Sequence, residues 1–71
     1  MDIKDRLIIE EKELSEKYEK LNVVIIDGLL FRNIPQNQRP LLKFQFQAMG
    51  IYLGALRERI KLLDEVKTIE G

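Results

Sequence analysis

The 71-residue sequence contains no cysteine and no histidine, and its only hydroxyl residues besides two tyrosines are Ser15 and Thr68. Disulfides are therefore excluded, and so are the usual zinc sites, which need cysteine or histidine ligands. Catalytic nucleophile–base pairs lack their usual members as well. No uncharged run approaches the roughly 20 residues that a membrane-spanning helix needs. We expect no catalysis, no metal, no cofactor and no membrane partner.

Net charge is also missing, because 12 Lys and Arg residues balance 12 Asp and Glu residues. No global field therefore attracts the chain to DNA or RNA, although a local basic cluster can still bind phosphate. The N-terminal sequence has no apolar core of a signal peptide. We expect a cytoplasmic protein without a nucleic-acid partner.

A chain of this length makes one domain at most, so we treat residues 1–71 as a single domain. Such a chain buries only about 60% of the surface that its unfolded form exposes. Small scaffolds are stabilised by disulfides, metals or oligomerisation, and the sequence leaves only the last of these. The composition therefore favours a homo-oligomer.

The first part of the chain is predicted to be an amphipathic helix over residues 2–26, with Asp2 as its N-cap. Its β-branched end, residues 22–26, could be a strand, but it continues the helical stripe and has no partner strand. Charged residues cover the other faces, and pairs such as Glu16–Lys20 have the i,i+4 spacing that stabilises helices. The apolar stripe consists of Leu7, Leu14, Tyr18, Leu21 and Ile25.

Residues 27–38 are predicted to be the loop that connects two helices. Asp27 and Gly28 stop the first helix, and Pro35 and Pro40 prevent a helix from running through. The loop is unusually apolar, so we expect it to fold over the helix ends or a neighbouring copy.

Residues 39–68 are predicted to be the second helix, which makes the chain an all-α antiparallel hairpin. One row of this helix alternates by three and four residues, like a coiled-coil seam, and suits packing on the first helix. This row is Leu42, Gln45, Met49, Tyr52, Leu56, Arg59 (or Ile60), Leu63 and Val66.

A second apolar row on the same helix needs a partner that one chain does not supply. It begins at Leu41. Gly50 and Gly54 lie between the two rows, where their missing side chains allow close backbone approach at a cost of about 1 kcal/mol each relative to alanine. We predict an oligomer interface on this face. Its residues are Phe44, Ala48, Ile51, Gly54, Ala55 and Leu62.

Basic and aromatic side chains are the candidates for ligand binding, because Arg and Lys contact phosphate and aromatic rings stack on bases. Each cation also has the plainer interpretation of a surface charge that balances a glutamate. Gln45 and Arg59 fall on the apolar row, where a polar group serves either a register-setting hydrogen bond or a ligand. Tyr18 and Tyr52 are expected to be core aromatics. The candidates are Arg6, Lys17, Lys20, Phe31 and Arg59, with Arg57 and Lys61 as further cations.

Two segments of the sequence carry recognisable motifs, RLIIEEKELSEKYEKLNVVI and LLKFQFQAMGIYLGALRERI. The first has an Arg-to-Glu start (Arg6 to Glu10) followed by the EL…EK…KL run. The second is a block that comprises Leu41, Leu42, Gln45, Met49, Tyr52, Leu56, Arg59 and Ile60. With these motifs the sequence resembles the helical-hairpin domain of phage anti-CBASS and anti-Thoeris sponge proteins.

The resemblance implies a compact homo-oligomer, commonly a hexamer, in the cytoplasm of an infected bacterial host. It implies that cyclic dinucleotides or related cyclic nucleotide signals are held between protomers and sequestered without cleavage. Carried over by position, Lys20 and the surroundings of Arg6 contact phosphate or base, and Arg59 belongs to a second inter-protomer pocket. Two alternatives stay open: a helical protein–protein interaction module with no nucleotide ligand, and a structural oligomer.

Overall fold

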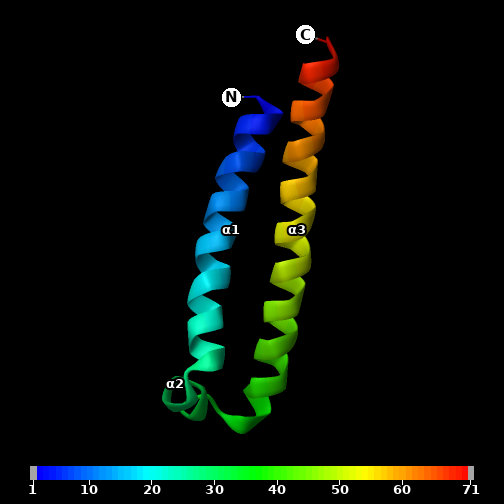
Figure 1. Cartoon of the computed structure of the whole chain (residues 1–71). Coiled ribbons are helices and arrows are strands. Elements are labelled where there is room, and N and C mark those ends of the chain that lie inside the picture. The colour runs from blue at the N-terminus through cyan, green and yellow to red at the C-terminus, as the bar shows by residue number, and fades with distance from the viewer. Residues whose placement is uncertain (1, 71) are drawn as a thin grey trace.

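The structure, a computed structural model, describes the backbone of residues 2–70 and the side chains of residues 2–64. These residues form helices and contain no strand, which confirms the predicted all-α class. Two long helices lie side by side, run in opposite directions and are joined at one end by two short helices (Figure 1). In chain order the elements are α1 (Ile3–Ile26), α2 (Gly28–Arg32), the 3-10 helix η1 (Gln36–Gln38) and α3 (Arg39–Glu70).

Asp2 and Asp27 set the ends of α1. The Asp2 carboxylate accepts a hydrogen bond of 2.8 Å from the Asp5 N–H, so the predicted N-cap is confirmed. Asp27 leaves the helical conformation, and its carboxylate accepts from the N–H groups of Leu29 and Leu30 at 2.9 and 3.1 Å. One residue therefore ends α1 and caps α2.

The predicted loop over residues 27–38 was wrong in part, since it contains α2 and η1. The physical reason is the Asp27 cap, which supplies acceptors for N–H groups that a one-turn helix leaves free. Arg39 holds the rest of the turn: its Nε donates to the Ile34 carbonyl at 3.0 Å and its guanidinium NH2 to the Arg32 carbonyl at 2.9 Å. The turn is thus hydrogen-bonded structure rather than open loop.

The row of α3 that packs on α1 differs from the predicted one. Phe46 stacks on Tyr18 with ring centroids 4.4 Å apart, and Leu53 and Leu56 are fully or almost fully buried. Gln45, predicted on this row, is exposed. The predicted row and the observed row both alternate by three and four residues, but only the observed row is wholly apolar. Packing the observed row on α1 therefore removes no polar side chain from water. The observed row is Leu42, Phe46, Met49, Leu53, Leu56, Ile60 and Leu63.

Two further expectations for that row change with it. Tyr52 was predicted to be a core aromatic but is 45% exposed, and Arg59 is exposed on the flank of the row. Tyr18, in contrast, is a half-buried core aromatic, as expected. Val66 lies outside the side chains that the structure describes.

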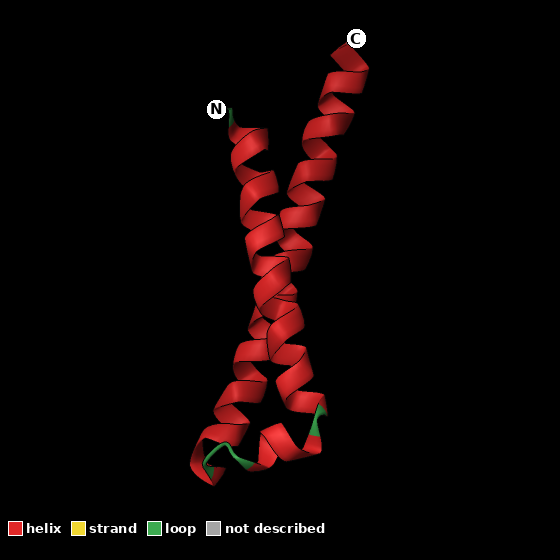
Figure 2. Cartoon of the chain, turned by 90° about the vertical axis from the view of Figure 1, so that its left-hand side faces the viewer, coloured by secondary structure: helices red, strands yellow, loops and turns green. Residues whose placement is uncertain are grey.

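The second apolar row of α3 is uncovered in the single chain. Phe44, Ile51 and Leu62 are 65%, 76% and 56% exposed, and Ala48, Gly54 and Ala55 are exposed as well. The two long helices cross at a shallow angle and form one rod of 53 × 17 × 17 Å, which has no second layer to cover this face (Figure 2). The homo-oligomer therefore stays a prediction, and the exposed row is its strongest support.

Candidate functional site

Two hollows open between α1 and α3, and each contains at least one cation that the sequence analysis singled out. We call the hollow of about 340 Å³ nearer the turn the lysine hollow. The hollow of about 220 Å³ at the free ends of the helices is the arginine hollow. The lysine hollow is lined by Lys17, Lys20, Leu21, Val24, Gln45 and Met49, and the arginine hollow by Ile3, Leu7, Arg59, Leu62 and Leu63.

In the lysine hollow, α1 supplies two cations and α3 supplies an amide. Lys17 and Lys20 stand one helical turn apart on α1, so both ammonium groups can approach one phosphate. Neither lysine forms an ion pair with another described residue. The predicted Glu16–Lys20 pair is therefore not among the ion pairs of the described residues. Gln45 faces them from α3 with one donor and one acceptor group. No carboxylate lines this hollow.

The floor of the lysine hollow is apolar. Leu21, Val24 and Met49 are half-buried and face the same space as the cations. An apolar floor beside cations and an amide can hold a flat base while its phosphate is paired. Sequence reasoning left Gln45 open as a ligand residue and missed Met49, because a methionine on an apolar row looks the same whether it fills the core or lines a hollow.

The arginine hollow is more apolar. Among the described residues that line it, Arg59 alone is charged, and Leu7 and Leu63 form its inner wall. The row that packs on α1 passes through Ile60, one residue further along, so Arg59 stands at the rim rather than inside the packing. A ligand here would meet one cation and a mainly aliphatic surface.

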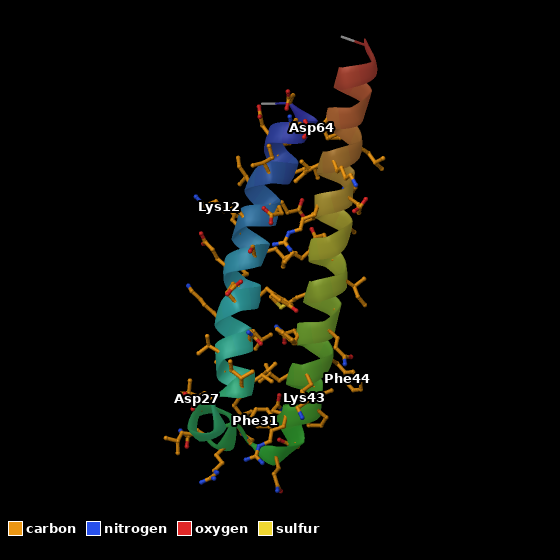
Figure 3. The ribbon with its side chains drawn as sticks, viewed as in Figure 1. Lys12, Asp27, Phe31, Lys43, Phe44 and Asp64 are labelled. Atoms are coloured by element: carbon orange, nitrogen blue, oxygen red, sulfur yellow. The ribbon has the colours of Figure 1, made fainter. Side chains whose placement is uncertain are left out.

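Arg6 and Phe31, also predicted as ligand residues, line neither hollow. Arg6 is exposed on α1. Phe31 was predicted to be a stacking residue in the loop, but it belongs to α2 and its ring is half-buried. Two cations lie over that ring. Lys43 Nζ is 5.3 Å from the ring centroid (Figure 3), and Arg39 Cζ is 5.5 Å from it. The five predicted ligand residues therefore do not form one site.

Positive and negative residues are concentrated in different parts of the rod, although the net charge of the chain is zero. Between Lys20 and Arg57 the sequence carries five cationic residues and one acidic residue, Asp27. That segment contains the turn and the α3 wall of the lysine hollow. The first nineteen residues, in contrast, carry seven acidic and four basic side chains. The turn half of the hairpin consequently has the sign that attracts phosphate.

Two polar contacts join α1 and α3 in the half of the hairpin near the free ends. The Arg57 Nε donates to Glu11 Oε1 at 3.1 Å, and Lys4 pairs with Asp64 near the free ends. The hydrogen bond to Asp64 raises the pKa of Lys4, while partial desolvation opposes the rise. Within residues 2–70, every helix is either too short or too polar to cross a bilayer.

Comparison with known proteins identifies a family. A family model described as Sequestin matches residues 1–62, which include the lysine hollow, the whole exposed row and the arginine hollow except for Leu63. No curated protein and no solved structure matches the chain.

Proposed function

The chain belongs to the Sequestin family of phage anti-defence sponge proteins, and on that premise we propose that it binds cyclic nucleotide immune signals and sequesters them without cleavage. The family assignment supports the sponge role, and the ligand class is our proposal. The site of action is the cytoplasm of the infected bacterial cell.

One observation carries the proposal: the lysine hollow gathers two cations that pair with no other described residue, an amide and an apolar floor on one surface. A cyclic dinucleotide presents the complementary groups, namely negatively charged phosphates, base edges with donors and acceptors, and flat rings. Lys17 and Lys20 would pair with a phosphate, Gln45 would bond a base edge, and Met49 would contact the ring. Hydrogen bonds to charged groups contribute about 1.5–3 kcal/mol each, which makes such a set adequate for tight binding.

Assembly would complete the pocket. In a single chain the lysine hollow has walls from α1 and α3 only, so a bound nucleotide would keep much of its surface in water. A second copy of the chain would cover the ligand and exclude that water, since an apolar row of α3 is still uncovered. We propose a homo-oligomer with inter-protomer pockets, and six copies as the number that the resemblance to phage sponges implies.

Sequestration without chemistry is the second part of the proposal. The described residues that line the two hollows are lysine, arginine, glutamine and apolar side chains, and none of these forms a nucleophile–base pair. A ligand held there would be removed from the immune effector by mass action alone. Efficient inhibition then requires a protein concentration above that of the signal and a dissociation constant below it.

A depletion and recovery assay tests the proposal. The purified protein is mixed with a panel of cyclic di- and trinucleotides and cyclic ADP-ribose isomers, filtered, and the free ligand is quantified before and after the retained protein is denatured. We expect one ligand class to disappear and to return unchanged. Return of an altered product would identify an enzyme and refute the sponge.

The alternative is a protein-interaction module that binds no nucleotide, and the exposed apolar row of α3 is the observation that favours it. The same assay separates the two functions. Depletion of no panel member would refute the nucleotide sponge and leave the interaction module as the remaining candidate.

A further inference from the structure

The exposed row of α3 is longer and more regular than its apolar members alone indicate. These members are Leu41, Phe44, Ala48, Ile51, Ala55 and Leu62, and Glu58 fills the gap before the last of them. With Glu58 included, the spacing alternates strictly between three and four residues, which is the pattern of a second coiled-coil seam. Figure 3 shows Phe44 on the side of α3 that points away from α1.

The side chains of this seam differ in size, with a large residue at the centre and small residues on either side of it. Its centre, Ile51, is 76% exposed, while Ala48 and Ala55 on either side are seven residues apart and small. Beside them, a Cβ built on Gly54 meets no atom within 4 Å in the chain. Small residues on both sides of one large residue allow another helix to approach closely and to pack around Ile51.

Glu58 decides the direction of that partner helix. If a second α3 packed in the parallel direction, each residue would face its own copy, and two Glu58 carboxylates would meet at a desolvated seam, which is unfavourable. In the antiparallel direction, Ile51 of one copy lies opposite Ile51 of the other. The numbers of any two residues that face each other across the two copies then add to about 102. Glu58 then faces Phe44 and comes beside Lys43 of the other copy.

The charges of the single chain fit the antiparallel arrangement. Glu58 and Lys43 are exposed, and neither forms an ion pair with another described residue. Lys43 lies over the Phe31 ring at 5.3 Å in the single chain, so the pairing requires its ammonium group to move from that ring to the side of Phe44. The antiparallel arrangement also places the cationic turn half of one copy beside the acidic free end of the other.

We propose that α3 packs antiparallel on α3 of a second copy, about a twofold axis at Ile51, with Ala48 facing the other copy's Ala55 and Lys43 paired with the other copy's Glu58. The inference rests on the proposed homo-oligomer but not on any ligand. It specifies one isologous interface, in which the two-fold symmetry repeats the Lys43–Glu58 pair.

Disulfide trapping reads the direction directly, because the natural chain has no cysteine. In the antiparallel arrangement, the Ala48 residues of the two copies are about 10 Å apart along the helix axis, because each residue adds 1.5 Å. Ala48 of one copy instead lies opposite Ala55 of the other. Disulfides require Cα atoms within about 7 Å. The Ala48→Cys and Ala55→Cys variants are therefore each oxidised alone. A mixture of the two variants is also refolded together and then oxidised, and all samples are free of ligand.

We expect the mixed disulfide to form and each variant alone to stay uncrosslinked. Self-crosslinking of each variant, with no preference for the mixture, would show a parallel pair and overturn the proposal. A protein that is helical by circular dichroism but gives no crosslink in any combination would overturn it as well.

A charge exchange provides an independent test that leaves the small residues intact. Lys43→Glu and Glu58→Lys each create two like-charge contacts per pair, so we expect each to weaken self-association by about tenfold, and the double variant to restore it. A double variant that associates no better than the worse single variant would contradict the pairing. Because both tests omit nucleotide, they can fail while the sponge function holds, and the depletion assay can fail while they succeed.

Discussion

The Tyr18 ring of α1 lies directly against the backbone of α3 at Gly50. A Cβ built on Gly50 would stand 3.3 Å from Tyr18 Cε2 and 3.4 Å from its hydroxyl oxygen. Phe46 stacks on the same ring at 4.4 Å, so the ring is held by two neighbouring turns of α3. The glycine therefore has a packing reason that outweighs its low helix propensity.

That contact separates two glycines that look equivalent in the sequence. Replacing a helical glycine by alanine gains about 1 kcal/mol where space is free. Gly54→Ala meets nothing within 4 Å in the chain, whereas Gly50→Ala must displace the Tyr18 ring. We expect Gly54→Ala to raise the free energy of unfolding clearly more than Gly50→Ala, measured by urea unfolding over a protein dilution series. Equal gains at the two positions would show that Tyr18 yields without cost.

Substitutions on the two opposite faces of α3 should affect different properties. Leu56 is fully buried against α1, so Leu56→Ala should lower the free energy of unfolding by about 2–5 kcal/mol. Ile51 faces away from α1, so Ile51→Asp should leave the helical content at low concentration unchanged and abolish assembly. Circular dichroism and sedimentation velocity measure the two effects. A fully oligomeric Ile51→Asp protein would contradict the assignment of the exposed row as an interface.

The turn should depend on the Asp27 side chain as a hydrogen-bond acceptor rather than as a charge. Asp27 accepts from two N–H groups of α2, and loss of such a cap costs about 1 kcal/mol. We expect Asp27→Ala to speed amide exchange at residues 28–31, and Asp27→Asn, which keeps an acceptor oxygen, to preserve protection. Loss of protection in both variants would mean that the negative charge is what stabilises the turn.

The free ends of the hairpin should loosen in alkaline solution. Because the hydrogen bond to Asp64 raises the pKa of Lys4 above its ordinary value of 10.5, the stabilisation is fully present below that pH. It is lost as the pH rises through the raised pKa. Lys4→Met removes the ammonium group, so the difference in stability between wild type and variant should shrink above pH 10.5 and also with added salt. A difference that stays constant across that range would exclude the ion pair as its source.

The sequence was sufficient for the helical class and for the exposed row, because both depend on periodicity and on a length too short for a second layer. It was insufficient to choose between Gln45 and Phe46 as the residue facing α1, since both fit an alternation of three and four. The choice follows from packing, because Phe46 can stack on Tyr18 while Gln45 would lose water.

Several individual residues of the candidate site were predictable from the sequence, but which of them lie together in one hollow was not. Lys17, Lys20 and Arg59 do line hollows, whereas Arg6 does not, although all are exposed cations on helices. Which cation meets an apolar hollow depends on the crossing of α1 and α3, and periodicity carries no information on that crossing. Phe31 was misplaced because Asp27, as a cap, turns an apparent loop into a helix.

The central claim is that the lysine hollow binds the phosphate of a cyclic nucleotide. Lys20→Glu reverses a charge inside the hollow, and Lys12→Glu makes the same change at an exposed position of α1 outside both hollows (Figure 3). The most direct measurement is a calorimetric titration of the wild type and both variants with the panel of cyclic nucleotides, after sedimentation has verified equal oligomer mass. We predict an affinity at least about tenfold lower for Lys20→Glu and close to that of the wild type for Lys12→Glu. Equal affinities for the two variants would contradict the account.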